Sequence, residues 1–137
     1  MVTSTGSRCG PIFPARSRVP AAGVNNSDIN TRLAWYSKGE GTSDEASWAG
    51  EPVRFPRIQG IDVCGRITAV GEGVASERIG ERVLVEPCLR EAGGRELERP
   101  WFLGSECDGG FAEYVAVASR HAYRYGVTII APPSSLR

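Results

Sequence analysis

Apolar and polar residues alternate most clearly over residues 61–70. One side of this stretch carries Ile61, Val63, Gly65, Ile67 and Ala69, and the other carries Asp62, Cys64, Arg66, Thr68 and Val70. A period of two predicts a half-buried strand, which Gly71 and Gly73 would close with a turn. Two further strands are predicted within 78–87 and 109–119, because glycine or proline bounds each stretch. Strands therefore dominate the predicted second half of the chain.

One helix is predicted near the start of the chain, after a short apolar stretch at 19–24. Asn26 or Ser27 can cap its amino end, and Asp28 lies in its first turn. The apolar positions follow at spacings of four and three, at Ile29, Leu33 and Tyr36. Residues 37–51 and 90–100 are predicted to be connecting loops, because glycine and polar or charged residues fill them.

The chain has 137 residues, which is about the length of one domain. Its 16 basic residues balance its 16 acidic residues, and the arginines are scattered among glutamates. Without a net positive field, we expect neither nucleic acid nor an anionic membrane surface as a partner. No stretch approaches the ~18 apolar residues of a membrane span, and no signal peptide is recognisable at the amino terminus. We therefore expect a cytoplasmic protein.

The four cysteines are widely and irregularly spaced, and the chain has one histidine. Such spacing predicts free thiols in a reducing compartment rather than a disulfide framework. A zinc site reassembled from distant residues is the alternative, although it would lack the short ligand pairs of known zinc sites. Its ligands would be Cys64, Cys88, Cys107 and His121.

Four blocks of the sequence resemble motifs of the medium-chain dehydrogenase/reductase superfamily. They follow one another in the same order as in that superfamily, and the intervals between them are similar. They are GVNNSD at 23–28, FPRIQGIDVCGRITAVGEGV at 55–74, IGERVLV at 79–85 and GGFAEYVAV at 109–117. The resemblance is to the amino-terminal, alcohol dehydrogenase-like catalytic domain of that superfamily. It implies a mainly β (α+β) fold, a GroES-like irregular β-barrel with one short helix, over residues 19–125.

The resemblance is lost outside that range. Residues 1–18 are predicted to be a disordered, atypical amino terminus, and residues 126–137 an atypical tail. No Rossmann domain is expected in this chain, because GEGV at 71–74 leads into another strand rather than into a helix that could hold a pyrophosphate. These features are typical of a truncated or frame-disrupted gene product, and we expect a fragment of a longer enzyme.

Zinc-dependent members of the superfamily place a cysteine where this chain has Asn25, and a His-Glu pair where it has Ile61 and Asp62. An isoleucine offers no lone pair, and an amide is a poor ligand for Zn²⁺. The segment 88–107 holds two cysteines rather than the four of a structural zinc lobe. We therefore expect no metal, and the pattern resembles the zinc-independent quinone oxidoreductase branch.

In that branch the resemblance implies that the block at 23–28 lines the cleft beside the nicotinamide. Asn25 would donate a hydrogen bond to a substrate carbonyl oxygen, and Asp28 would orient Asn25 or hold the nicotinamide side. Tyr36 is a candidate proton donor, with packing as its alternative role. Arg32 is a candidate partner for cofactor phosphate or for Asp62. Helix capping alone would also explain Asn25 and Asp28.

We therefore expect the catalytic portion of an NAD(P)H-dependent oxidoreductase that acts on a carbonyl compound, a quinone or an enone. Catalytic roles are predicted for Asn25, Asp28 and Tyr36, and cofactor contacts for Asn25, Asp28 and Arg32. The expected partners are a small-molecule substrate and either a second copy of the chain or a separate nucleotide-binding domain. The alternative is a non-catalytic GroES-like module or an inactive gene fragment.

Overall fold

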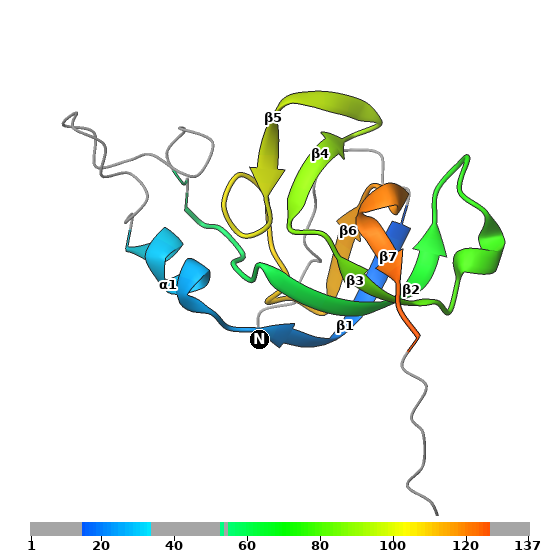
Figure 1. Ribbon diagram of the computed structural model, residues 1–137, viewed down its shortest axis with the longest axis horizontal. Coiled ribbons are helices and arrows are strands. Elements are labelled where there is room, and N and C mark those ends of the chain that lie inside the picture. Colours follow the sequence, from blue (N-terminus) through cyan, green and yellow to red (C-terminus); the bar gives the residue numbers. More distant parts are fainter. Residues whose placement is uncertain (1–14, 34–52, 54, 127–137) are drawn as a thin grey trace, which may run out of the picture.

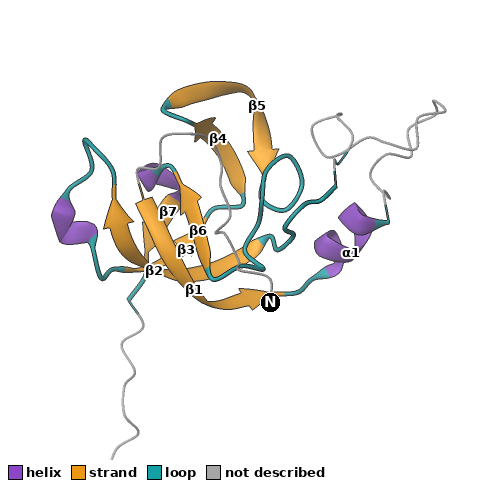
Figure 2. Cartoon of the chain, turned by 180° about the vertical axis from the view of Figure 1, so that it is seen from behind, coloured by secondary structure: helices purple, strands orange, loops and turns teal. Residues whose placement is uncertain are grey.

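The computed structural model describes residues 15–33, 53 and 55–126. Its largest element is an antiparallel sheet in the spatial order β6-β1-β2-β3-β7 (Figure 1). In that order the strands are Tyr114–Val117, Ala15–Gly23, Asp62–Val70, Arg82–Val85 and Ala122–Arg124. Strands predominate, as Figure 2 shows, so the mainly β fold expected from the sequence is confirmed.

A hairpin of β4 (Cys88–Ala92) and β5 (Arg95–Phe102) forms a second, two-stranded sheet. Its turn consists of Gly93 and Gly94, with φ of 62° and 74°. Positive φ at both positions is the conformation of a type I′ turn, which glycine adopts without strain. The prediction of a loop over 90–100 is therefore wrong. Charged side chains stand on both faces of this hairpin and hide the apolar alternation by which strands are recognised.

The hairpin contains a pair of like charges. Glu91 and Glu96 lie directly opposite each other on β4 and β5. Arg120 contacts both carboxylates, with its Nη1 atom 3.2 Å from Glu91 and 3.9 Å from Glu96. The arginine offsets the repulsion that two facing carboxylates would otherwise produce. It also connects the hairpin to the segment between β6 and β7.

The hydrophobic core lies between the sheet and the hairpin. β2 presents Val63 and Ile67 to it, whereas Asp62, Arg66 and Thr68 on the same strand are exposed. This is the alternation predicted from the sequence. The hairpin contributes Leu89, which is fully buried. The remaining buried apolar residues of this cluster are Ala15, Val83, Val85, Leu103, Cys107, Val115, Val117 and Ala122.

The α-helix α1 (Asn26–Arg32) follows β1 and lies at one end of the sheet (Figure 1). Asn25 is its N-cap, one residue before the predicted caps. Two apolar residues at the predicted spacing, Ile29 and Leu33, are 52% and 68% exposed. The sequence therefore predicts the helix correctly, but its apolar positions are not part of the core. No helix within the described part of the chain is long and apolar enough to cross a membrane.

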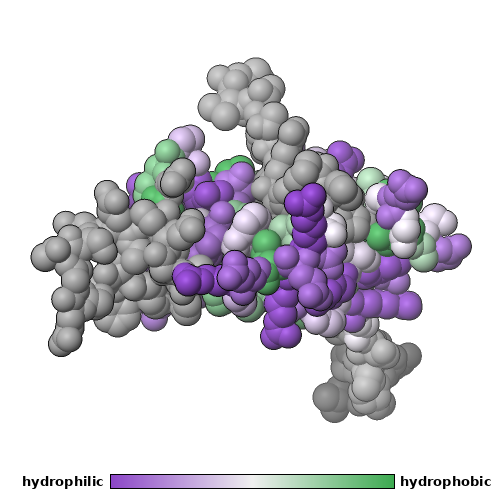
Figure 3. All heavy atoms as spheres, turned by 90° about the horizontal axis from the view of Figure 1, so that it is seen from above, coloured by the Kyte–Doolittle hydropathy of each residue, from purple (hydrophilic) through white to green (hydrophobic). Residues whose placement is uncertain are grey.

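The fold begins earlier than the sequence predicts. β1 starts at Ala15, four residues before the predicted start at Val19, and Ser17 on it is buried. β1 pairs with β6 over Ala15–Arg18, so this part of the predicted disordered terminus belongs to the sheet. Arginine and serine side chains break the apolar alternation there and conceal the strand. Seen from above in Figure 3, the described surface is mainly hydrophilic, with small separate hydrophobic groups.

Candidate functional site

The buried carboxylate of Asp28 connects α1 to the segment that enters β2. Its Oδ2 atom accepts a hydrogen bond from the backbone N–H of Asn25 at 3.0 Å. Its Oδ1 atom accepts from the backbone N–H groups of Gly60 at 3.2 Å and Ile61 at 3.1 Å. The side chain of Gln59 donates to the backbone carbonyl of Asp28 at 3.0 Å. One carboxylate thereby fixes the start of the helix against the start of β2.

Asn25 stands at the junction that Asp28 creates. Its Oδ1 atom accepts from the backbone N–H of Ser27 at 2.6 Å, and together with the bond from Asn25 to Asp28 this forms a capping box. Its Nδ2 atom donates to Oδ2 of Asp62. These two bonds fix the orientation of the amide, because a flipped amide would place its oxygen against the Asp62 carboxylate. No described residue accepts the second Nδ2 hydrogen.

A shallow pocket of about 290 Å³ lies beside this junction. The carboxylate of Asp62 is its one charged lining group, and Gly23 forms part of its wall next to the helix start. The other lining residues come from β1, β2 and β3 and are Ala21, Val63, Cys64, Leu84 and Val85. The pocket is therefore mostly apolar, with its carboxylate at the end nearest to Asn25.

Close packing of glycines holds the segment that leads into this site. Gly109 donates to the carbonyl of Ile58 at 2.7 Å, and Gly110 donates to the carbonyl of Gly60 at 2.8 Å. A Cβ atom at Gly109 would overlap the backbone carbonyl of Gly60. Glycine is required here so that the two backbones can approach each other. The block at 109–117 and the block at 55–74 thus meet beside the site.

The structure brings two of the predicted site residues together, since Asn25 and Asp28 are hydrogen-bonded to each other. The hydrogen bonds that cap the helix are the same bonds that position Asn25 and Asp28 in the site. Arg32 lies exposed in the last turn of α1 and forms no ion pair with any described residue. Asp62 is bound by Asn25 rather than by Arg32. Tyr36 lies outside the described residues.

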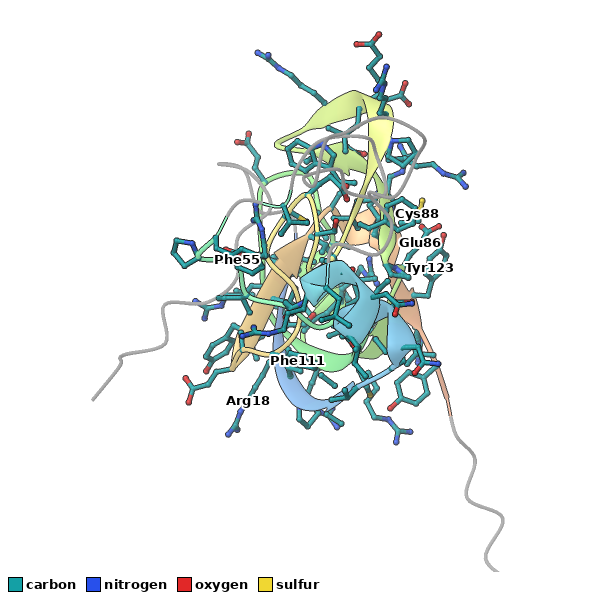
Figure 4. All side chains as sticks on the ribbon, turned by 90° about the vertical axis from the view of Figure 1, so that its left-hand side faces the viewer. Arg18, Phe55, Glu86, Cys88, Phe111 and Tyr123 are labelled. Carbon is teal, nitrogen blue, oxygen red and sulfur yellow. The ribbon has the colours of Figure 1, made fainter. Side chains whose placement is uncertain are left out.

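A second polar cluster, which the sequence pattern does not indicate, lies at the end of β3. His121 is buried, and its Nδ1 atom lies 2.8 Å from Oε2 of Glu86. Its Nε2 atom accepts from the backbone N–H of Arg90 at 3.2 Å, which leaves Nδ1 as the donor to Glu86. The hydroxyl of Tyr123 also approaches Glu86, at 3.4 Å (Figure 4). The one sequence signal that could have indicated this cluster is His121, the single histidine of the chain.

This cluster bears on the reassembled zinc site considered above. Both ring nitrogens of His121 are engaged by protein groups, so neither is directed toward Cys64, Cys88 or Cys107. Across residues 15–33 and 55–126, no three His, Cys, Asp or Glu side chains are grouped so that they could hold a metal ion. The cluster holds β3, β4 and β7 together instead.

The turn at 71–74 is followed by a 3-10 helix of three residues, Ser76–Arg78, and then by β3. A helix that short offers no row of free N–H groups for a pyrophosphate. The turn at 71–74 therefore does not form a dinucleotide phosphate site of the strand-turn-helix kind. This agrees with the sequence-based expectation that no Rossmann unit is present.

Known proteins resemble this chain over the part that the sheet and the site occupy. The starvation-sensing protein RspB of Escherichia coli K12 is 38% identical over 79 residues, covering 52% of this chain and 23% of RspB. The quinone oxidoreductase of Lama guanicoe is 32% identical over 107 residues, covering 78% and 23%. The crystal structure of RspB from E. coli CFT073, in complex with NADH, has a TM-score of 0.59 and 28% identity, covering 90% and 32%.

The matches cover between 19% and 31% of the length of these and the other curated relatives. Residues 15–126 match the model of the alcohol dehydrogenase GroES-like domain. That range starts at the first residue of β1 and includes the whole described sheet, the helix and the site. The chain therefore belongs to the alcohol dehydrogenase GroES-like domain family of the medium-chain dehydrogenase/reductase superfamily.

Proposed function

We propose that this chain is the catalytic-domain portion of an NAD(P)H-dependent oxidoreductase that reduces a carbonyl compound, a quinone or an enone. The observation that carries the proposal is the Asn25 amide, oriented by Ser27 and Asp62 beside a mostly apolar pocket. Relatives in the family include a quinone oxidoreductase and a protein that binds NADH, which supports this chemistry.

In this proposal Asn25 directs its second Nδ2 hydrogen at the substrate oxygen. Negative charge develops on that oxygen as hydride adds to the carbonyl carbon, or to the conjugated carbon of an enone or quinone, and a fixed donor stabilises the charge without having to reorient. A proton then completes the reduction, and Tyr36 is proposed as its donor. Asp28 acts through Asn25, because it holds the backbone from which the amide projects. The apolar wall of the pocket would accommodate the hydrocarbon part of a quinone or enone.

The donor set at this position does not fit a catalytic zinc. The superfamily's zinc ligands correspond to Asn25 and Ile61, which are an amide and a hydrocarbon. The amide oxygen of Asn25 already accepts a hydrogen bond from Ser27, and an amide oxygen is a weaker zinc ligand than a thiolate or an imidazole. We therefore propose the zinc-independent branch and derive no step through a metal.

NAD(P)H would supply the hydride when bound. We propose that Asn25 and Asp28 contact its nicotinamide side and that a separate nucleotide-binding domain holds most of its phosphate contacts. Arg32 is exposed in the last turn of α1 and is proposed as a contact to that cofactor, with Tyr36 as a residue of the same cleft. Cys64, Cys88 and Cys107 are free thiols, which supports the reducing environment of the cytoplasm as its compartment.

The test measures NADPH consumption with a quinone substrate, using this chain alone and fused to a nucleotide-binding domain. In the fused protein we expect Asn25→Ala to lower kcat by about 10² to 10³, the range for loss of one oxyanion donor. Asn25→Ser retains a capping oxygen and should lose the same activity with less loss of stability. Asn26→Ala, on the exposed neighbouring residue, is the matched control.

Unchanged turnover in the fused Asn25→Ala protein would refute the role of the amide. A fused protein with no activity at all, together with a folded monomer in light scattering, would favour the non-catalytic module. The observation that keeps this second candidate is that the turn at 71–74 leads through a three-residue 3-10 helix into β3 rather than into a phosphate-binding helix.

A further inference from the structure

Three arginines lie side by side on the outer face of the sheet. Arg18 on β1 lies opposite Arg66 on β2, and Arg66 lies opposite Arg82 on β3. All three are exposed, whereas Ser17, Gly65 and Val83, the residues next to them in sequence, are buried. Figure 4 shows Arg18 extending away from the sheet. Arg18 and Arg66 are 48 residues apart in the sequence, and Arg66 and Arg82 are 16 apart. The antiparallel register places these three positive charges in one row, called here the arginine row.

Among the described residues, no ion pair neutralises this row. Like charges directly opposite each other on neighbouring strands are destabilising. On the hairpin, the facing pair Glu91 and Glu96 is offset by Arg120. Within the described part of the chain, no carboxylate forms an ion pair with any member of the arginine row. Arg66 donates to a backbone carbonyl, that of Gly80, at 2.6 Å.

The neighbouring row on the same face is apolar. Ala21 on β1 and Leu84 on β3 both lie opposite Cys64 on β2, and all three line the pocket described above. Leu84 is 50% exposed. Cys64 and Arg66 are two residues apart on one strand, so the apolar row and the arginine row are separated by about 7 Å.

Tyr125 joins the two rows. Its hydroxyl lies 2.9 Å from the sulfur of Cys64, and its ring lies under the guanidinium of Arg82, 5.5 Å from the ring centroid. The hydrogen bond to Cys64 and burial raise the pKa of Tyr125, against smaller opposing effects of Arg82 and Arg66. The phenol therefore stays protonated at neutral pH and links the two rows through its contacts with Cys64 and Arg82.

We propose that this face binds a small anionic amphiphile, namely a phosphate monoester with a short hydrocarbon body. The phosphate is held by Arg66 and Arg82, with Arg18 at the edge of the row, and the body lies over Cys64 and Leu84 in the pocket. Planar guanidinium groups match phosphate oxygens in paired hydrogen bonds, which suits an arginine row better than a lysine row. Binding would also remove the repulsion within the row. The hydrocarbon body would occupy the pocket that the proposed function assigns to the hydrocarbon part of a quinone or enone, whereas the phosphate contacts do not involve Asn25.

The test titrates the full chain with hexyl phosphate, inorganic phosphate and hexanol in a calorimeter at low salt. We expect hexyl phosphate to bind at least tenfold more tightly than either fragment. Arg66→Gln and Arg82→Gln should each weaken it by about tenfold, the loss expected for one charged contact. Arg95→Gln, on the exposed hairpin, is the matched control and should change nothing. Leu84→Thr should weaken hexyl phosphate and leave inorganic phosphate unaffected.

Thermal melting shows whether the variants stay folded. Loss of repulsion within the row opposes loss of the Arg66 bond to Gly80 and of the Arg82 contact with Tyr125, so we expect only a small change in melting temperature. A second arm measures retention on phosphatidylcholine vesicles with and without phosphatidic acid. Retention that requires phosphatidic acid and is lost in Arg66→Gln and Arg82→Gln assigns the phosphate to a lipid headgroup. Hexyl phosphate binding without retention assigns it to a soluble ester. The proposal is overturned if hexyl phosphate binds no better than inorganic phosphate, or if Arg95→Gln weakens it equally.

Discussion

Replacing Asp28 with asparagine tests the joint between α1 and β2. The carboxylate accepts three backbone N–H groups, two on Oδ1 and one on Oδ2. Asparagine keeps the oxygen but places an NH₂ group against the third N–H. A buried donor left without a partner costs about 1–3 kcal/mol, and hydrogen bonds to a charged acceptor exceed neutral ones by about 1 kcal/mol each. We therefore expect Asp28→Asn to lower the free energy of unfolding by about 3–5 kcal/mol.

Urea unfolding, followed by far-ultraviolet circular dichroism, measures this change. With a urea m-value of about 2 kcal/mol/M, the midpoint should fall by about 1.5–2.5 M. Glu72→Gln, in the exposed turn after β2, is the control and should stay within about 0.5 kcal/mol of the wild type. A loss below about 1 kcal/mol in Asp28→Asn would show that the carboxylate does not fix the helix start against β2. The backbone of Asn25 would then not be held by Asp28, and the proposed orientation of its amide would lose its basis.

Three further substitutions test the packing and the titration described above. Leu89→Ala, at a fully buried position of the hairpin, should cost about 2–5 kcal/mol in urea unfolding, and a cost under 1 kcal/mol would place the hairpin outside the cooperative core. Gly109→Ala should yield little folded protein in circular dichroism because its Cβ meets backbone, whereas Gly126→Ala, which meets nothing, should melt like the wild type. Tyr125 should ionise above pH 10 in an ultraviolet titration, and Cys64→Ala should lower that pKa, because the thiol raises it and the nearby arginines lower it; an unchanged midpoint contradicts this.

The parts of the fold that the sequence predicted are those in which burial imposes a local period. β2 is recognisable because Val63 and Ile67 face the core while Arg66 and Thr68 face solvent. The hairpin was missed because neither of its faces repeats apolar residues, although the Gly93-Gly94 pair was a usable turn signal. Local period therefore predicts strands whose apolar alternation is complete, and it overlooks β4, β5 and the start of β1, where charged or polar side chains interrupt the alternation.

The candidate site divides in the same way. Asn25 and Asp28 are three residues apart, so the sequence could predict that they cooperate. The contacts from Asp28 to Gly60 and Ile61 join positions more than 30 residues apart, which no local pattern contains. The arginine row illustrates the point further, because scattered arginines become neighbours only when three strands adopt their register.

The hairpin turn has a practical consequence for engineering the chain. Gly93 and Gly94 close a two-residue connection between Ala92 and Arg95, and Gly94 is exposed. The hairpin forms its own two-stranded sheet, so its tip supplies no backbone hydrogen bond to the five-stranded sheet. A peptide tag or a tethered fluorophore inserted between the two glycines would lengthen an exposed connection while leaving the site and the arginine row in place. A label at this tip could therefore be used in binding experiments at the Asn25 site and at the arginine row without altering either surface.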